Sequence, residues 1–226
     1  MMQPVVRRAV VAIQAILFTA CLLLPAGCNI LGAIAAKAPK PDIEAAYKGM
    51  RDQTVGVMVW ADRNSTLVDW PQVQLHVGGM LQEKLKKAAA LPETEDLIGI
   101  RFPYEAASFI RYQKERPALE AAAITDVAPK LGVSRLIYIE VESLSTRAAD
   151  AFSLKLGQME VDLKVIEVHD GKGTLAFEDR IRVQFPKKST KEGELKYTDS
   201  QIYTGTIHAM TTELALRFIK HPDDSP

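Results

Sequence analysis

Cysteine is scarce in this chain of 226 residues, since it occurs only as Cys21 and Cys28. Residues 29–226 can therefore form neither a disulfide bond nor a thiolate metal site. A segment of that length can bury a sizeable core as one domain, so it needs no covalent staple.

A surplus of charge of either sign is also missing. The chain carries 28 basic and 28 acidic residues, and removal of residues 1–27, which include Arg7 and Arg8, would leave 26 basic and 28 acidic residues and a net charge of −2. This balance lacks the basic footprint of a nucleic-acid-binding protein, so we expect no nucleic-acid partner.

Motifs of catalysis and of cofactor binding are absent as well. The sequence has no phosphate-binding glycine loop, no G-x-S-x-G and no zinc-site pattern. No pair of its histidines has the i, i+4 spacing of a helical metal site; they are His76, His169, His208 and His221. Glu140 and Glu142 should share the solvated face of a strand, without a nucleophile beside them. We expect no enzyme activity, no metal and no cofactor.

The N-terminus has the layout of an export signal. Arg7 and Arg8 precede an apolar run, residues 9–24, that ends in small residues and Cys28. The stretch LLLPAGC resembles the lipobox of bacterial lipoproteins, although Pro25 stands where that pattern prefers leucine. The resemblance implies a signal peptide over residues 1–27 and lipidation of Cys28. Ordinary secretion and an uncleaved membrane anchor are the alternatives.

Lipidation would attach the protein to a membrane without making it cross. Two or more acyl chains hold a protein stably at a lipid surface, whereas one chain holds it only marginally. Residues 28–41 then form a tether. Asn29 follows the cysteine, and the sorting rule of many Gram-negative lipoproteins then implies the periplasmic face of the outer membrane, with the inner membrane as the alternative.

The remaining residues, 42–226, are predicted to form a single globular α/β (α+β) domain. Its mixed sheet should have about five strands, including a long C-terminal hairpin, and helices should pack on it. The strands are expected at residues 54–60, 97–102, 135–142, 159–165 and 175–183. The helices are expected at residues 42–51, 69–89, 104–114, 124–131 and from Thr198 or Asp199 to about Phe218.

Three stretches carry a further resemblance: TVGVMVWAD, APKLGVSRLIYIEVESLS and VIEVHDGKGTLAFEDRIRV. Over residues 54–220 the chain resembles the envelope lipoproteins grouped around CsgG, LpoB and the N-terminal domain of TolB. The resemblance implies their order of strands and helices and a role in a cell-envelope assembly. A long amphipathic insertion that could build a pore is not seen, which argues against a channel.

The loop after the first strand is the candidate binding site. It contains Asp62, Arg63, Asn64, Asp69 and Trp70, at the edge where open sheets of this kind bind ligands. The structural alternative is a polar loop in which Asp69 caps the following helix, with Pro71 in its first turn.

Two hypotheses of function follow. The first is a non-catalytic, membrane-tethered periplasmic lipoprotein that acts as an accessory or scaffold, pairing its sheet edge or this loop with an envelope protein or a second copy of itself. The second is a small-ligand or glycan binding module with its pocket at this loop.

Overall fold

The computed structural model describes residues 41–147, 155–187 and 197–223. Residues 43–221 belong to one compact unit, and of a second unit the structure describes residues 41–42 and 222–223. Within the latter, the amide of Asp223 donates a hydrogen bond to the carbonyl of Pro41 (3.0 Å). Two short strands, β1 (Asp42–Ile43) and β6 (His221–Pro222), form a two-stranded sheet. The predicted signal peptide, Cys28 and residues 28–40 of the tether lie outside the described residues.

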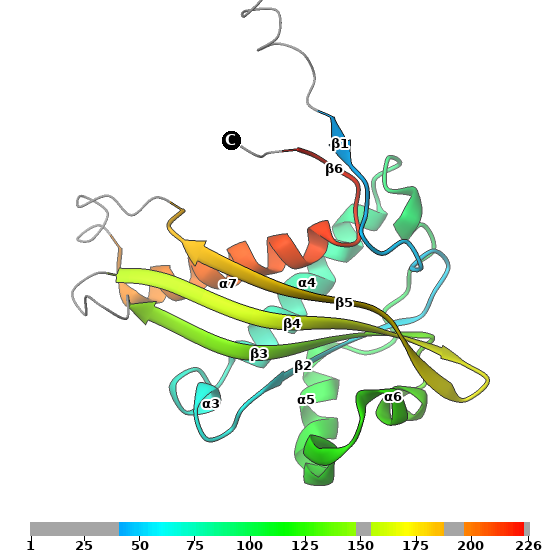
Figure 1. The fold of residues 1–226 in the computed structure, drawn as a ribbon, viewed down its shortest axis with the longest axis horizontal. Helices are drawn as coiled ribbons and strands as arrows, with labels where there is room; N and C mark the ends of the chain where they lie inside the picture. Colours follow the sequence, from blue (N-terminus) through cyan, green and yellow to red (C-terminus); the bar gives the residue numbers. More distant parts are fainter. Residues whose placement is uncertain (1–40, 148–154, 188–196, 224–226) are drawn as a thin grey trace, which may run out of the picture. The chain divides into compact units, whose positions relative to one another are not determined.

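The larger unit is built on a sheet of four strands in the order β2-β3-β4-β5 (Figure 1). They are β2 (Val55–Ala61), β3 (Arg135–Arg147), β4 (Lys155–His169) and β5 (Lys172–Phe185). β2 runs parallel to β3, whereas the other two pairs are antiparallel. The predicted mixed α/β class is confirmed.

One face of the sheet, here called the inner face, is covered by the two long helices α4 (Val73–Ala89) and α7 (Asp199–Leu216) (Figure 1). Alternate residues of each strand point into this layer because side chains alternate along a strand. Val57, Ile139 and Leu163 are among them, and each is at most 1% exposed. The main core therefore lies between the sheet and these two helices.

The opposite face, here called the outer face, is covered at one end only. A second cluster there joins Met58 and Leu136 of the sheet to α5 (Ala106–Glu115), α6 (Ile124–Val127) and the 3-10 helix η3 (Ala128–Leu131). The contact with α5 is close, since a Cβ atom on Gly56 would lie 2.7 Å from Phe109 Cζ. The rest of the outer face carries charged side chains.

The predicted hairpin and terminal helix are confirmed. Asp170 and Gly171 join β4 to β5 with positive φ angles of 50° and 73°, the geometry of a type I′ turn, which matches the twist of the two strands. The helix α7 begins with a capping box between Thr198 and Gln201. Both features follow from local sequence chemistry.

Two predicted elements are wrong. Residues 97–102 form no strand: η1 (Glu95–Leu97) is a 3-10 helix, and only Arg101 bridges to Thr54. The sheet therefore has four strands rather than about five. Residues 42–51 form no helix, because Tyr47 and Met50 are buried by distant partners; the Tyr47 amide donates to the carbonyl of Arg217 (2.9 Å).

Candidate functional site

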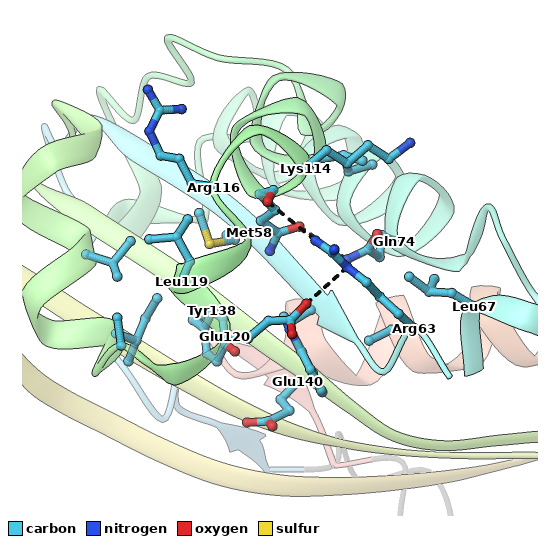
Figure 2. A pocket seen from close by; sticks show the side chains of 17 residues that line it. Met58, Arg63, Leu67, Gln74, Lys114, Arg116, Leu119, Glu120, Tyr138 and Glu140 are labelled. Atoms are coloured by element: carbon cyan, nitrogen blue, oxygen red, sulfur yellow. Dashed lines mark hydrogen bonds and ion pairs between the residues drawn. The ribbon is translucent and has the colours of Figure 1, made fainter. Parts of the chain in front are cut away.

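A cavity of about 360 Å³ lies on the outer face beside the carboxyl end of β2 (Figure 2). Its sheet side is formed by Met58 and Trp60 of β2 and by Tyr138 and Glu140 of β3. Its other walls come from the end of α5, the 3-10 helix η2 (Pro117–Ala121) and α6. The cavity opens where the cover of the outer face by helices ends, so its position follows from the fold.

The parallel pairing of β2 with β3 sets the sheet side of the cavity. In this register Met58 lies beside Tyr138, and Trp60 lies beside Glu140. Neighbouring strands are about 4.8 Å apart, and residues two apart on a strand share a face. Two aromatic rings and one carboxylate are thus held close together on rigid strands.

Two buried amide side chains, Gln74 of α4 and Gln113 of α5, meet at the edge of β2. The Nε2 atoms of both donate to the carbonyl of Val59, at 2.9 and 3.1 Å. Gln74 Nε2 also lies 3.2 Å from Gln113 Oε1. The outward carbonyl of Val59 therefore has side-chain partners in place of a further strand, and the wall of the cavity is fixed to the sheet.

Arg63 forms one rim of the cavity. Its Nε lies 3.0 Å from Glu120 Oε1, and its Nη2 donates to the carbonyl of Gln113 (3.5 Å), as Figure 2 shows. Both side chains of the ion pair are close to half exposed, so its contribution to stability is small, about 0–1 kcal/mol. The pair joins the loop after β2 to η2.

Some polar side chains that line the cavity have no hydrogen-bond or ion-pair partner among the described residues. Burial and the neighbouring Glu142 raise the pKa of Glu140, although Lys164 acts in the opposite direction. Burial also raises the pKa of Tyr138, helped by Glu140 and Glu142. A raised pKa of an acid means that its charged form is disfavoured, and for both groups the main cause is burial.

The predicted binding loop does not act as one site. Asp62 accepts hydrogen bonds from the Ser65 hydroxyl (2.7 Å) and the Asn64 amide (3.1 Å), which close a turn and lower the pKa of Asp62. Of the five predicted residues, Arg63 is the one that lines the cavity, whereas Asp62 and Asn64 shape the loop that carries it.

Asp69 and Trp70 lie elsewhere. Asp69 ends the short helix α3 (Thr66–Asp69), and Gln72 is the N-cap of α4, so the predicted cap at Asp69 is wrong. Trp70 stacks on Tyr203 of α7, with ring centroids 4.9 Å apart and planes 13° apart. The hydroxyl of Tyr203 lies 2.8 Å from His76 Nδ1. These rings pack on the main core.

Sequence reasoning missed several residues that line the cavity. Glu140 was expected on a solvated face with Glu142; Glu142 is exposed, but Glu140 is partly buried and lines the cavity. Trp60, a half-buried strand residue, was the signal that could have led to Glu140, its neighbour across the parallel pair. Gln113 and Lys114 gave no signal, because only the packing of α5 places them here.

The described residues contain neither a membrane-spanning helix nor a metal-binding cluster of side chains. No helix there is long and apolar enough to cross a membrane. No group of three or more His, Cys, Asp or Glu side chains within those ranges is placed to hold a metal ion.

No family model and no curated protein matches the chain. Three solved structures are similar to parts of it. The PelC dodecamer from Paraburkholderia phytofirmans has a TM-score of 0.43 at 8% identity, covering 79% of this chain and 96% of that one. Protein CT253 from Chlamydia trachomatis has a TM-score of 0.41 at 11% identity, covering 73% and 91%. The lipoprotein GNA1162 from Neisseria meningitidis has a TM-score of 0.33 at 13% identity, covering 72% and 95%.

All three TM-scores lie below 0.5, so these similarities establish neither a shared fold nor a shared function. Their names do not include CsgG, LpoB or TolB, and the resemblance to that group stays a prediction.

Proposed function

We propose that this protein is a non-catalytic lipoprotein of the bacterial cell envelope, anchored through Cys28, whose globular unit acts as an accessory or scaffold for an envelope protein. The signal-like N-terminus with its lipobox resemblance supports the anchor. The periplasmic face of the outer membrane is the proposed location, following Asn29.

The observation that carries the scaffold role is a difference between the two edges of the sheet. At the β2 edge, the carbonyl of Val59 accepts bonds from two glutamine amides, and the Val55 amide donates to the carbonyl of Arg101 (2.7 Å). β5, at the other edge, pairs with β4 alone among the described strands. An unpaired edge presents free backbone donors and acceptors to a partner strand.

A groove beside the free edge adds room for side chains of such a strand. It is lined in part by Phe185 at the end of β5, by Pro186 after it, and by Gly205 and Ala209 of α7. In strand addition, backbone hydrogen bonds supply affinity and adjacent pockets supply specificity. The occupant we propose is a strand of an envelope protein; pairing with a second copy of this chain is the other outcome of the test below.

The test has two stages. Intact mass and membrane fractionation of the native protein and of Cys28→Ser should show a lipidated chain beginning at Cys28, and its loss in the variant. A photo-crosslinker at Gln184, exposed on β5, should then capture a partner, whereas the same crosslinker at Arg111, exposed on α5, should not. An unmodified native chain would contradict the lipid anchor at Cys28. Equal capture at both positions would contradict partner binding at the β5 edge.

A second candidate function is small-ligand binding, and the cavity beside Trp60 favours it. Ligand sites are typically concave, with volumes of about 300–1,000 Å³ and a few placed polar groups on an apolar lining. At about 360 Å³ the cavity falls within that range. A ligand-induced rise in melting temperature would support this function, because a ligand that binds only the folded state stabilises it.

A further inference from the structure

The groove beside β5 lies where a further strand of the sheet would lie. In Figure 1, α7 crosses behind β5, and its C-terminal half is seen beyond the β5 edge. The groove, of about 950 Å³, is lined by residues 182–187 at and after the end of β5 and by one side of α7. A strand added beside β5 would therefore have this helix under its inner face, as β4 and β5 have.

The inner side of this position is apolar. Val183 and Phe185 line the groove from β5, and Val183 also packs against the main core. A Cβ atom on Gly205 of α7 would collide with the ring of Phe185, so this ring lies directly on the helix backbone. Ala209, one turn further along α7, is also small. Inward side chains of an added strand would meet an aromatic ring and a helix surface without large side chains, which favours apolar residues there.

Two features limit the part of the edge that is open. At one end, Asp179 lies on the inner side of β5, and Arg217, which follows α7, donates to it (Nε to Oδ2, 2.6 Å). Inward charges are one of the devices that block the addition of a strand. At the other end, Pro186 follows β5 and has no backbone N–H to donate. The open edge therefore extends over residues 180–185.

The outer side of the same edge is basic. Arg180 and Arg182 of β5 lie opposite Asp162 and Glu160 of β4, and their side chains are 56% and 71% exposed. Among the described residues, Arg182 donates from Nη2 alone, to Glu160 Oε1 (2.8 Å). A guanidinium group has five N–H donors, so most of those of Arg182 remain for a further acceptor. Carboxylates on an added strand would lie directly opposite these two arginines and be attracted to them.

A second copy of β5 is a poor partner for this edge. A two-fold antiparallel pairing that places Arg182 opposite Glu178 of the second copy also places Arg180 opposite its own copy. The pairing that places Arg180 opposite Glu178 places Asp179 opposite its own copy. Like charges directly opposite each other destabilise a pair of strands. A strand of another protein with acidic outward residues avoids both conflicts.

We propose that the partner strand at the β5 edge alternates acidic residues, which face Arg180 and Arg182, with apolar residues, which enter the groove over Phe185 and α7. The inference rests on the proposed scaffold function and names the chemistry of its partner. It does not depend on the cavity beside Trp60.

The test is disulfide exchange with two competing peptides, because a reversible covalent link makes a weak preference measurable. The full chain with Cys28→Ser and Gln184→Cys has a single cysteine after residue 21. The acidic probe is Glu-Val-Glu-Val-Cys-Val-Glu-Val-Glu, and the basic probe has lysine in place of each glutamate; both are acetylated and amidated. Both read the same in either direction, so they suit a parallel or an antiparallel strand.

Intact mass after equilibration in a mild thiol buffer gives the ratio of the two adducts. The acidic probe should exceed the basic probe about tenfold, since two cross-strand pairs change from opposite to like charges. The matched control has Ala107→Cys, exposed on α5, in place of Gln184→Cys, and should show no preference. A third probe with serine in place of each valine should be captured about tenfold less than the acidic probe at position 184, and equally at position 107.

Charge variants assign the preference to the edge. Arg182→Glu should favour the basic probe, and Arg182→Gln should reduce the preference for the acidic probe without reversing it. Arg111→Glu, exposed on α5, is the matched control and should keep the tenfold preference. Arg182 is largely exposed, so these variants should remain folded, which thermal unfolding checks.

Three outcomes would overturn the proposed partner chemistry. They are equal capture of the acidic and basic probes at position 184, the same preference at positions 107 and 184, and an unchanged preference in folded Arg182→Glu. Equal capture of the serine probe would refute its apolar part. If the crosslinker at Gln184 nevertheless captures an envelope protein, the scaffold function stands without this chemistry. If the acidic preference is found but the crosslinker captures no partner, the scaffold function fails instead.

Discussion

The inner and outer faces of the sheet are stabilised by different interactions. On the inner face, Val161, Leu163 and Val165 of β4 are each fully buried under the helices. On the outer face, the residues between them form ion pairs with β5: Asp162 with Arg180 (2.6 Å) and Lys164 with Glu178 (3.6 Å). One strand thus contributes alternately to a dry core and to a charged surface.

The difference explains where the cavity lies. Glu160 also has a cation beside it, Arg182 at 2.8 Å, so the carboxylates of β4 on the open face are paired. Glu140 stands where the cover of α5 ends and is left without such a partner among the described residues. The place on the outer face where the cover by helices ends therefore has both a cavity and a carboxylate without an ion-pair partner among the described residues. The inner face and the uncovered part of the outer face do not combine these two features in the described residues.

The largest expected effect is on the inner face. Leu163→Ala should lower the free energy of unfolding by about 2–5 kcal/mol, because it removes buried methyl groups and leaves a cavity. Lys164→Ala, the next residue on the outer face, should change it by less than about 1 kcal/mol. Urea unfolding measures both. Equal losses in the two variants would refute the difference between the faces.

The next largest loss in the free energy of unfolding is expected at the edge of β2. Gln74→Ala removes an amide that bonds the carbonyl of Val59 and leaves Gln113 Oε1 buried without this donor. We expect a loss of about 1–3 kcal/mol in the free energy of unfolding. Gln72→Ala, exposed just before the same helix, is the control and should be close to neutral. An unaffected Gln74→Ala protein would show that the amide pair does not stabilise the edge.

A smaller effect is expected from the outer ion pairs. Asp162→Asn should cost about 0.2–1 kcal/mol, less at high salt, because Arg180 is largely exposed. The bidentate bond from Arg180 lowers the pKa of Asp162. The stabilisation from the Asp162–Arg180 ion pair is therefore present above the pKa of Asp162 in the unfolded chain, about 3.9. It is lost as the pH falls through the lower pKa of Asp162 in the folded protein. Unfolding at several salt concentrations and pH values tests this, and a salt-independent loss would contradict it.

The smallest expected change, at Glu140, should increase the free energy of unfolding, whereas the changes above decrease it. Glu140 lies directly across from Asp162 in the β3–β4 pair. Burial raises the pKa of Glu140, whereas the hydrogen bond from Arg180 lowers the pKa of Asp162. A raised carboxyl pKa gives stability that is fully present below the unfolded pKa and is lost as the pH rises through the folded pKa. Glu140→Gln should therefore stabilise the protein at pH 7 by on the order of 0.5 kcal/mol. Melting temperatures at pH 7 and pH 4 measure this, and the gain should shrink at the lower pH.

The sequence by itself determined the features that depend on neighbouring residues. The alternation of β4 and β5, the turn at Asp170 and Gly171, and the cap at Thr198 each need only a few consecutive residues, and the structure confirms them. The mixed α/β class followed from the order of such local signals. The signal-like N-terminus also depends on local pattern, although it lies outside the described residues.

The tertiary structure decided the rest, because contacts distant in sequence outweighed local pattern. Residues 97–102 look like a strand, but Arg101 makes a single bridge. The binding loop was predicted from its own polar residues, and only Arg63 lines the cavity. The partners that form the other walls, Gln113 and Glu140, come from α5 and β3, more than 45 residues away in sequence. No local pattern could join them, since parallel pairing and the packing of α5 bring them together.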